Sequence, residues 1–100
     1  MKAVFNGQVI AEADKDDLIF IEGNWYFPPD SIKEEFYTKS DTPYTCPWKG
    51  ECSYKDVTVD GMTAKDGAFS YDTPLESAIQ RVKKDFTGYY AFWNGVEVTE

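Results

Sequence analysis

The chain has 100 residues, of which 42% are hydrophobic and 17% aromatic, and its formal net charge is −8 at pH 7. A chain of this length supplies one hydrophobic core, so we expect residues 1–100 to form a single domain. The ten basic residues are scattered along the sequence. Because nucleic-acid binding needs a basic face, we expect no nucleic-acid partner.

The sequence contains no apolar run near the roughly 18 residues that a membrane span needs, and strand-like residues follow Met1 directly. We therefore expect a soluble, cytoplasmic protein with no membrane partner. Cys46 and Cys52, without a secretion signal, indicate free thiols rather than a disulfide.

Three turn signatures organise the chain. Asn6-Gly7, Asp60-Gly61 and Asn94-Gly95 each lie between short runs of β-forming residues. These pairs adopt the positive φ angles of a type I′ turn at low cost, which predicts three β-hairpins. With aromatic residues outnumbering leucine, the composition also favours strands. We predict an all-β domain of short antiparallel strands and hairpins with one short helix.

The first half of the chain also contains two short strands, at residues 18–21 and 25–27. Pro28 and Pro29 end the second one, because proline cannot donate to a sheet. Residues 31–38 are expected to hold a helical turn with Ile32, Phe36 and Tyr37 facing inward, and residues 40–43 to form a loop.

In the second half, residues 51–59 predict one longer strand and residues 88–92 another. The only helix is expected over residues 73–84, with Thr73 as its cap, Pro74 at its first position and Glu76 completing a capping box. Because this helix is short, we expect it to cover one end of the sheet.

The segment Thr45-Cys46-Pro47-Trp48-Lys49-Gly50 combines a thiol, a rigid turn, an indole and an ammonium. A nearby cation activates a thiol, so Cys46 and Lys49 are candidate catalytic residues for redox or covalent chemistry. The chain has no histidine, which excludes Cys-His and Ser-His-Asp mechanisms. The alternative is that Cys46 is a small buried apolar residue.

Metal sites have little support in the sequence. Cys46 and Cys52 are the only cysteines, whereas a structural zinc site takes four nitrogen or sulfur ligands. Asp56 and Asp60 share a strand face, but Asp60 is explained by its turn, and no glycine-rich phosphate loop is present. We expect no metal and no cofactor.

An aromatic pocket is a second candidate site. Indole and phenol rings prefer one apolar and one wet side, so several of the many rings are expected to line a groove. The predicted ligand-binding residues are Trp25, Phe27, Trp48, Lys49, Tyr54 and Trp93. The alternative is that the rings replace leucine in the core.

Several blocks of this sequence resemble one known family. They are residues 23–29 (GNWYFPP), 40–42 (SDT), 45–50 (TCPWKG), 53–54 (SY) and 91–96 (AFWNGV), and they span nearly the whole chain. The set resembles the small, mostly bacterial domain-of-unknown-function family 427. The resemblance implies a β-tent-like arrangement, in which antiparallel sheets meet at an angle.

Activity does not follow from this resemblance. Relatives of the same architecture carry paired Cys-x-x-Cys zinc ligands, which this chain lacks. The family has been labelled nucleotidyltransferase-like, yet the Gly-Ser and Asp-x-Asp features of such enzymes are missing here.

Three functions therefore remain open from the sequence. The first is a small-molecule binding domain in which Lys49 attracts an anionic or carbonyl group into the aromatic pocket. The second is a small enzyme that uses Cys46 or Lys49, or, by the family label, transfers a nucleotidyl group. The third is a protein-interaction domain with an aromatic patch.

Overall fold

Two of the three predicted hairpins form around type I′ turns in the computed structural model, which describes residues 1–100. Asn6-Gly7 joins β1 (Lys2–Phe5) to β2 (Gln8–Glu12), and Asp60-Gly61 joins β6 (Gly50–Val59) to β7 (Met62–Ser70). The long strand predicted over residues 51–59 is thus confirmed as β6.

The third turn forms, but its flanking strands do not pair. Asn94 and Gly95 have φ angles of 51° and 99°. However, β8 (Tyr90–Phe92) pairs with β7, whereas β9 (Glu97–Thr99) pairs with β1. The hairpin prediction is wrong here because the free edge of β1 takes up the C-terminal strand, and the turn becomes a crossing between two sheets.

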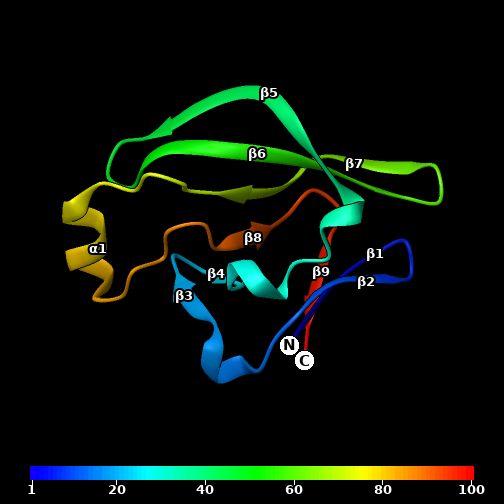
Figure 1. The fold of residues 1–100 in the computed structure, drawn as a ribbon, viewed down its shortest axis with the longest axis horizontal. Helices are drawn as coiled ribbons and strands as arrows, with labels where there is room; N and C mark the ends of the chain where they lie inside the picture. Colours follow the sequence, from blue (N-terminus) through cyan, green and yellow to red (C-terminus); the bar gives the residue numbers. More distant parts are fainter.

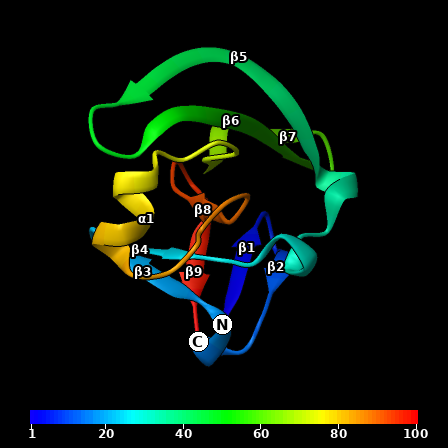
Figure 2. The same cartoon turned by 60° about the vertical axis from the view of Figure 1, so that its left-hand side comes forward.

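The strands form three antiparallel sheets with the orders β2-β1-β9, β3-β4 and β5-β6-β7-β8 (Figure 1). The hairpin of β3 (Ile19–Ile21) and β4 (Asn24–Tyr26) closes at Glu22-Gly23. Reciprocal hydrogen bonds between Phe27 and Tyr90, of 2.7 and 2.9 Å, join this hairpin to β8. The β5, β6 and β7 strands form the upper layer, with the two smaller sheets beneath it (Figure 2).

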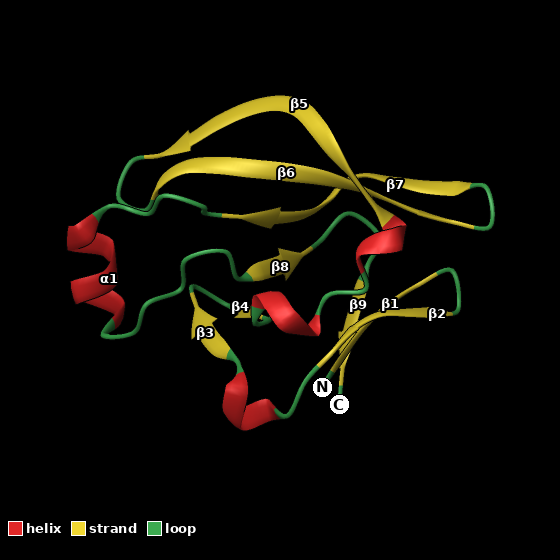
Figure 3. Ribbon diagram, in the orientation of Figure 1, coloured by secondary structure: helices red, strands yellow, loops and turns green.

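Helical structure is limited to short pieces (Figure 3). Three 3-10 turns occupy η1 (Lys15–Asp17), η2 (Pro29–Ser31) and η3 (Glu34–Phe36), the last within the predicted helical turn. Strands dominate the remainder, so the chain is an all-β domain with one short α-helix. The structure contains no helix with the length and apolar character needed to cross a membrane.

Residues 40–43 do not form the predicted loop but belong to β5 (Tyr37–Cys46). Between Lys39 and Pro43 this strand shifts its register against β6, and the shifted segment is attached to Asp66 of β7. The side chains of Ser40 and Thr42 both donate to the Asp66 carboxylate, at 2.5 and 2.8 Å. The turn-forming residues therefore mark a bulge inside a strand.

The helix α1 (Glu76–Val82) is shorter than the predicted 73–84, and Thr73 does not cap it. Leu75 occupies the capping position, and its N–H donates to the carbonyl of Lys49 at 3.0 Å. This long-range bond holds Leu75 in an extended conformation, which delays the helix start. As expected, α1 lies at one end of the large sheet (Figure 1).

Two hydrophobic clusters lie on opposite faces of the large sheet. Val57, Ala68 and Phe92 belong to the first cluster, whereas Cys52, Phe69 and Ala91 belong to the second. Successive side chains of a strand point to opposite faces, so neighbours in sequence separate into different clusters. This alternation decides which aromatic rings reach the candidate site.

Candidate functional site

A cavity of about 520 Å³ opens between the β3–β4 turn and the ends of β5, β6 and β7. Seven of the residues that line it are hydrophobic, and six aromatic side chains dominate its wall: Tyr44, Trp48, Tyr54, Phe69, Tyr71 and Trp93. Glu22, Asn24 and Lys49 supply its polar groups. We call this cavity the aromatic pocket.

Strand alternation explains how the wall is assembled. Tyr44 and Cys46 on β5 share a face, and Tyr44 lies opposite Cys52 of β6. Two residues further along β6, Tyr54 pairs with Phe69 of β7. Spacings of two in three adjacent strands thus place their rings on one side of the sheet.

Trp93 is held at the pocket by contacts on two sides. Its indole Nε1 donates to the carbonyl of Asp66 at 2.6 Å. Its ring stacks on that of Tyr54, with centroids 6.1 Å apart and planes at 17°. Trp93 and Tyr44 are both 47% exposed, so they form the solvent-facing rim.

Lys49 is a nearly buried ammonium at the polar end of the pocket. Its side chain is 8% exposed, and Nζ donates to Glu22 Oε1 at 2.9 Å. Nζ also lies 5.3 Å from the Trp48 ring centroid and 5.1 Å from that of Tyr71, which are favourable cation–π distances. Glu22 is the only carboxylate that pairs with this ammonium, and the Tyr26 hydroxyl lies near it.

The charge state of Lys49 follows from this setting. Burial lowers the pKa of the ammonium, but the hydrogen bond to Glu22, together with nearby Tyr26 and Cys46, outweighs burial and leaves the pKa above its ordinary value. Lys49 is therefore a fixed positive charge rather than a neutral amine nucleophile.

Beside Lys49, the Tyr26 hydroxyl is buried without a hydrogen-bond partner, and burial raises its pKa.

Trp48 joins the pocket to α1. The guanidinium of Arg81, the only arginine in the chain, lies 4.5 Å from the Trp48 ring centroid. Arg81 forms no salt bridge with a carboxylate. Two cations thus flank the Trp48 ring, and only Glu22 balances them.

Of the predicted binding residues, Trp48, Lys49, Tyr54 and Trp93 come together in the aromatic pocket, whereas Trp25 and Phe27 do not line it. Phe27 is fully buried in the first cluster, and Trp25 packs on the outside of that cluster. Between them, Tyr26 points to the second cluster beside the pocket. Trp25 and Phe27 thus lie on the opposite side of this segment from Tyr26, because successive side chains of an extended chain alternate.

Both cysteines are free and buried, at 7% and 6% exposure for Cys46 and Cys52. Cys46 lines the aromatic pocket. Burial raises the pKa of the Cys52 thiol, with Tyr71, Lys55 and Lys49 opposing this effect. A raised pKa disfavours the reactive thiolate of Cys52. No cluster of three or more His, Cys, Asp or Glu side chains is arranged to hold a metal ion.

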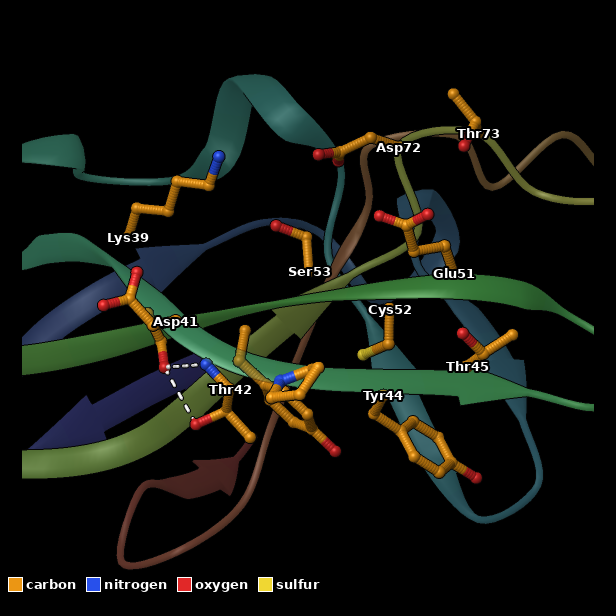
Figure 4. Close-up of a pocket in the computed structure, with 13 residues that line it drawn as sticks. Lys39, Asp41, Thr42, Tyr44, Thr45, Glu51, Cys52, Ser53, Asp72 and Thr73 are labelled. Carbon is orange, nitrogen blue, oxygen red and sulfur yellow. Dashed lines mark hydrogen bonds between the residues drawn. The ribbon is translucent and has the colours of Figure 1, made fainter.

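A second cavity, of about 430 Å³, lies along β5 and β6 and is mainly polar. Figure 4 shows Glu51, Ser53 and Asp72 on one side of the strands, with Tyr44 pointing away from them. This groove has a mainly polar lining and lacks the convergent rings of the aromatic pocket.

Several pocket residues were missed from the sequence although signals for them existed. Phe69 and Tyr71 show the same spacing of two as Cys52 and Tyr54, which indicates one strand face. Glu22 precedes Gly23 at a turn position where asparagine or aspartate is usual. This unusual residue choice indicates that the Glu22 side chain has a role beyond the turn.

The comparisons with known proteins agree with the resemblance seen in the sequence. No match was found among curated proteins. The family model described as "Domain of unknown function (DUF427)" matches residues 1–100. The chain therefore belongs to the domain-of-unknown-function family 427.

Proposed function

We propose that the chain is a small-molecule binding domain and that the aromatic pocket is its binding site. The observation that carries this proposal is the convergence of six aromatic rings and one nearly buried ammonium on a single cavity. Such a cavity buries a flat ring against apolar walls while Lys49 orients an anionic or carbonyl group.

The rim residues support an open site rather than an unfilled part of the core. Tyr44 and Trp93 remain about half exposed although each contacts other rings. A flat ligand would cover this apolar surface, which supplies a driving force of roughly 25 cal/mol for each Å² removed from water.

A thermal-shift screen of aromatic acids, aromatic amides, nucleosides and sugars tests the proposal. A ligand at about a hundred times its Kd adds about 2.7 kcal/mol of stability, which is a shift of several degrees for a domain of this size. We expect the shift to disappear in Trp93→Ala and to persist in Trp25→Ala, a tryptophan outside the pocket. The absence of any shift, or a shift that Trp93→Ala retains in full, would contradict the proposal.

The enzyme alternative has less support. Covalent chemistry at Lys49 needs a neutral amine, whereas Glu22 keeps the pKa of Lys49 above its ordinary value. Cys46 remains a candidate thiol because it lines the pocket, and its alkylation rate relative to an unfolded control measures its reactivity. A rate in the folded protein above that of the unfolded control would favour the enzyme.

The interaction-domain alternative relies on the exposed rings. Phe20, Tyr44 and Trp93 are the most exposed aromatic side chains. Phe20 packs on Trp25, and neither of these two lines the aromatic pocket. Co-purification of a stoichiometric partner that is lost in Tyr44→Ser would favour this alternative over small-molecule binding.

A further inference from the structure

Glu22 occupies a backbone position that does not suit glutamate. The chain contains four two-residue turns with positive φ at both residues, and three of them use Asn6, Asp60 and Asn94 at the first position. The fourth uses Glu22, with a φ of 50°. Asparagine and aspartate tolerate this left-handed conformation better than glutamate, so turn formation does not explain Glu22.

The side chain of Glu22 gives an explanation. Its carboxylate reaches Lys49 at 2.9 Å, although the Glu22 side chain itself remains 54% exposed. The hydrogen bond from Lys49 lowers the pKa of Glu22, burial opposes this, and the charges of Lys49 and Arg81 add to the lowering. A surface carboxylate thus reaches into the pocket to neutralise a nearly buried cation.

Lys49 needs an anion because its ammonium is largely removed from water. An unpaired buried charge is strongly destabilising, so some carboxylate must contact Nζ in every state of the pocket. Once another carboxylate contacts Nζ, release of Glu22 costs little, because its half-exposed side chain returns to solvent. The place that it vacates adjoins Lys49, the Trp48 ring and the pocket wall.

We propose that the Glu22 carboxylate occupies the position of a ligand carboxylate, and that the aromatic pocket binds a flat monocarboxylic acid that displaces Glu22 from Lys49. This inference rests on the proposed binding function and adds the chemical class of the ligand. Exchange of one carboxylate for another preserves the charge balance beside Lys49 and Arg81, whereas a neutral amide that displaced Glu22 would leave Lys49 without an anion.

The matched probes 2-naphthoate and 2-naphthamide test this proposal, since they share a flat ring system and differ in charge. Binding is followed by the indole N–H signals of Trp48 and Trp93 in heteronuclear NMR spectra, with Trp25, the third tryptophan, as an internal reference outside the pocket. The variants are Glu22→Gln and Lys49→Met, with Glu97→Gln, which removes an exposed carboxylate of β9, as the charge control.

We expect the wild-type protein to bind the acid at least five times more tightly than the amide. Glu22→Gln removes the internal competitor and should tighten acid binding about tenfold while leaving amide binding unchanged. Lys49→Met should abolish the preference for the acid, and Glu97→Gln should change neither Kd. Circular dichroism melts of each variant confirm that it is folded.

Each contrary result is distinct. Equal binding of acid and amide by the wild-type protein, or weaker acid binding by Glu22→Gln, overturns the carboxylate inference and leaves the pocket a binding site. Failure of both compounds to move the Trp48 or Trp93 signal in any folded variant counts against the carboxylate inference and also against the binding function itself.

Discussion

Lys49 is buried and Lys55 half-buried, and their ammonium groups have different partners in the large sheet. Lys49 receives a carboxylate from the β3–β4 turn, at 2.9 Å. Lys55 instead donates to the Ser70 hydroxyl and the Ser53 carbonyl, and its Nζ lies 4.6 Å from the Tyr90 ring centroid.

The pKa directions reflect this difference. Lys49 has a raised pKa because Glu22 and its other neighbours outweigh burial. Burial lowers the pKa of Lys55, and the charge of Asp72 only partly compensates. The Lys55 ammonium donates to groups of its own sheet. The Lys49 ammonium is paired with the carboxylate of Glu22, whose side chain is half-exposed. The two ammonium groups therefore differ in their partners, a half-exposed carboxylate for Lys49 and groups of the same sheet for Lys55.

Phe27→Ala gives the largest expected effect, because Phe27 belongs to the first hydrophobic cluster and lies outside the aromatic pocket. Phe27 is fully buried and packs edge-to-face on Phe92, with centroids 5.4 Å apart. Its truncation should cost about 3–5 kcal/mol of unfolding free energy in urea titrations. Trp25→Ala, at a partly exposed neighbour, should cost less. Comparable losses in the two variants would contradict the assignment of Phe27 to the core.

Asp66→Asn tests the hydrogen bonds that attach the β5 bulge to β7, and asparagine tolerates the Asp66 φ of 55°. The variant loses charged hydrogen bonds to Ser40 and Thr42, so we expect a loss of about 1–3 kcal/mol at neutral pH. Urea unfolding of both proteins gives this difference. A loss below about 0.5 kcal/mol would show that the β5 bulge does not depend on these bonds.

The same variant has a defined acid dependence. Burial raises the pKa of Asp66, but bonds from Ser40 and Thr42 and the charge of Lys65 outweigh it, so the folded pKa is below the ordinary value. The stabilisation is therefore present above the unfolded pKa, near 3.9, and is lost as the pH falls through the folded pKa. The difference in unfolding free energy between wild type and Asp66→Asn should therefore shrink as the pH falls below the unfolded pKa. A difference that does not change with pH would contradict a lowered pKa of Asp66 in the folded state.

Alkaline titration gives the smallest effect and the most direct comparison of the two lysines. Protonation of Lys49 stabilises the fold below the unfolded lysine pKa of about 10.4, and this contribution is lost as the pH rises through the folded pKa. Lys55 behaves oppositely, because its lowered pKa makes stability rise between the folded and unfolded values.

Unfolding free energies measured between about pH 9 and pH 11 test both pH dependences, the loss of stability from Lys49 and the gain from Lys55. Relative to wild type, Lys49→Met should lose less stability over this range and Lys55→Met should lose more, each by about 1 kcal/mol or less. Both substitutions also remove a cation that lowers the pKa of Cys52, so the slopes of the two variants are compared with each other as well as with wild type. Equal slopes in the two variants would remove the distinction between the lysines.

Local chemistry in the sequence was sufficient for much of the fold. Asn-Gly and Asp-Gly turns specify their own backbone geometry, so the β1–β2 and β6–β7 hairpins followed from a few adjacent residues. The same holds for the long β6 strand and for the presence of one helix near residue 80. The Cys46–Gly50 segment contributes Trp48 and Lys49 to the wall of the aromatic pocket.

Long-range pairing decided the rest. The sequence near Asn94-Gly95 does not show that β9 would pair with the free edge of β1 while β8 pairs with β7. Nor does the capping pattern at Thr73 show that the Leu75 N–H would bond to Lys49. The face of the strand that holds Trp25, Tyr26 and Phe27 was set by docking against two clusters on opposite sides of the sheet. Turns depend on neighbours in the chain, whereas sheet partners and strand faces depend on residues far away in sequence, so only the tertiary structure determined which rings surround Lys49.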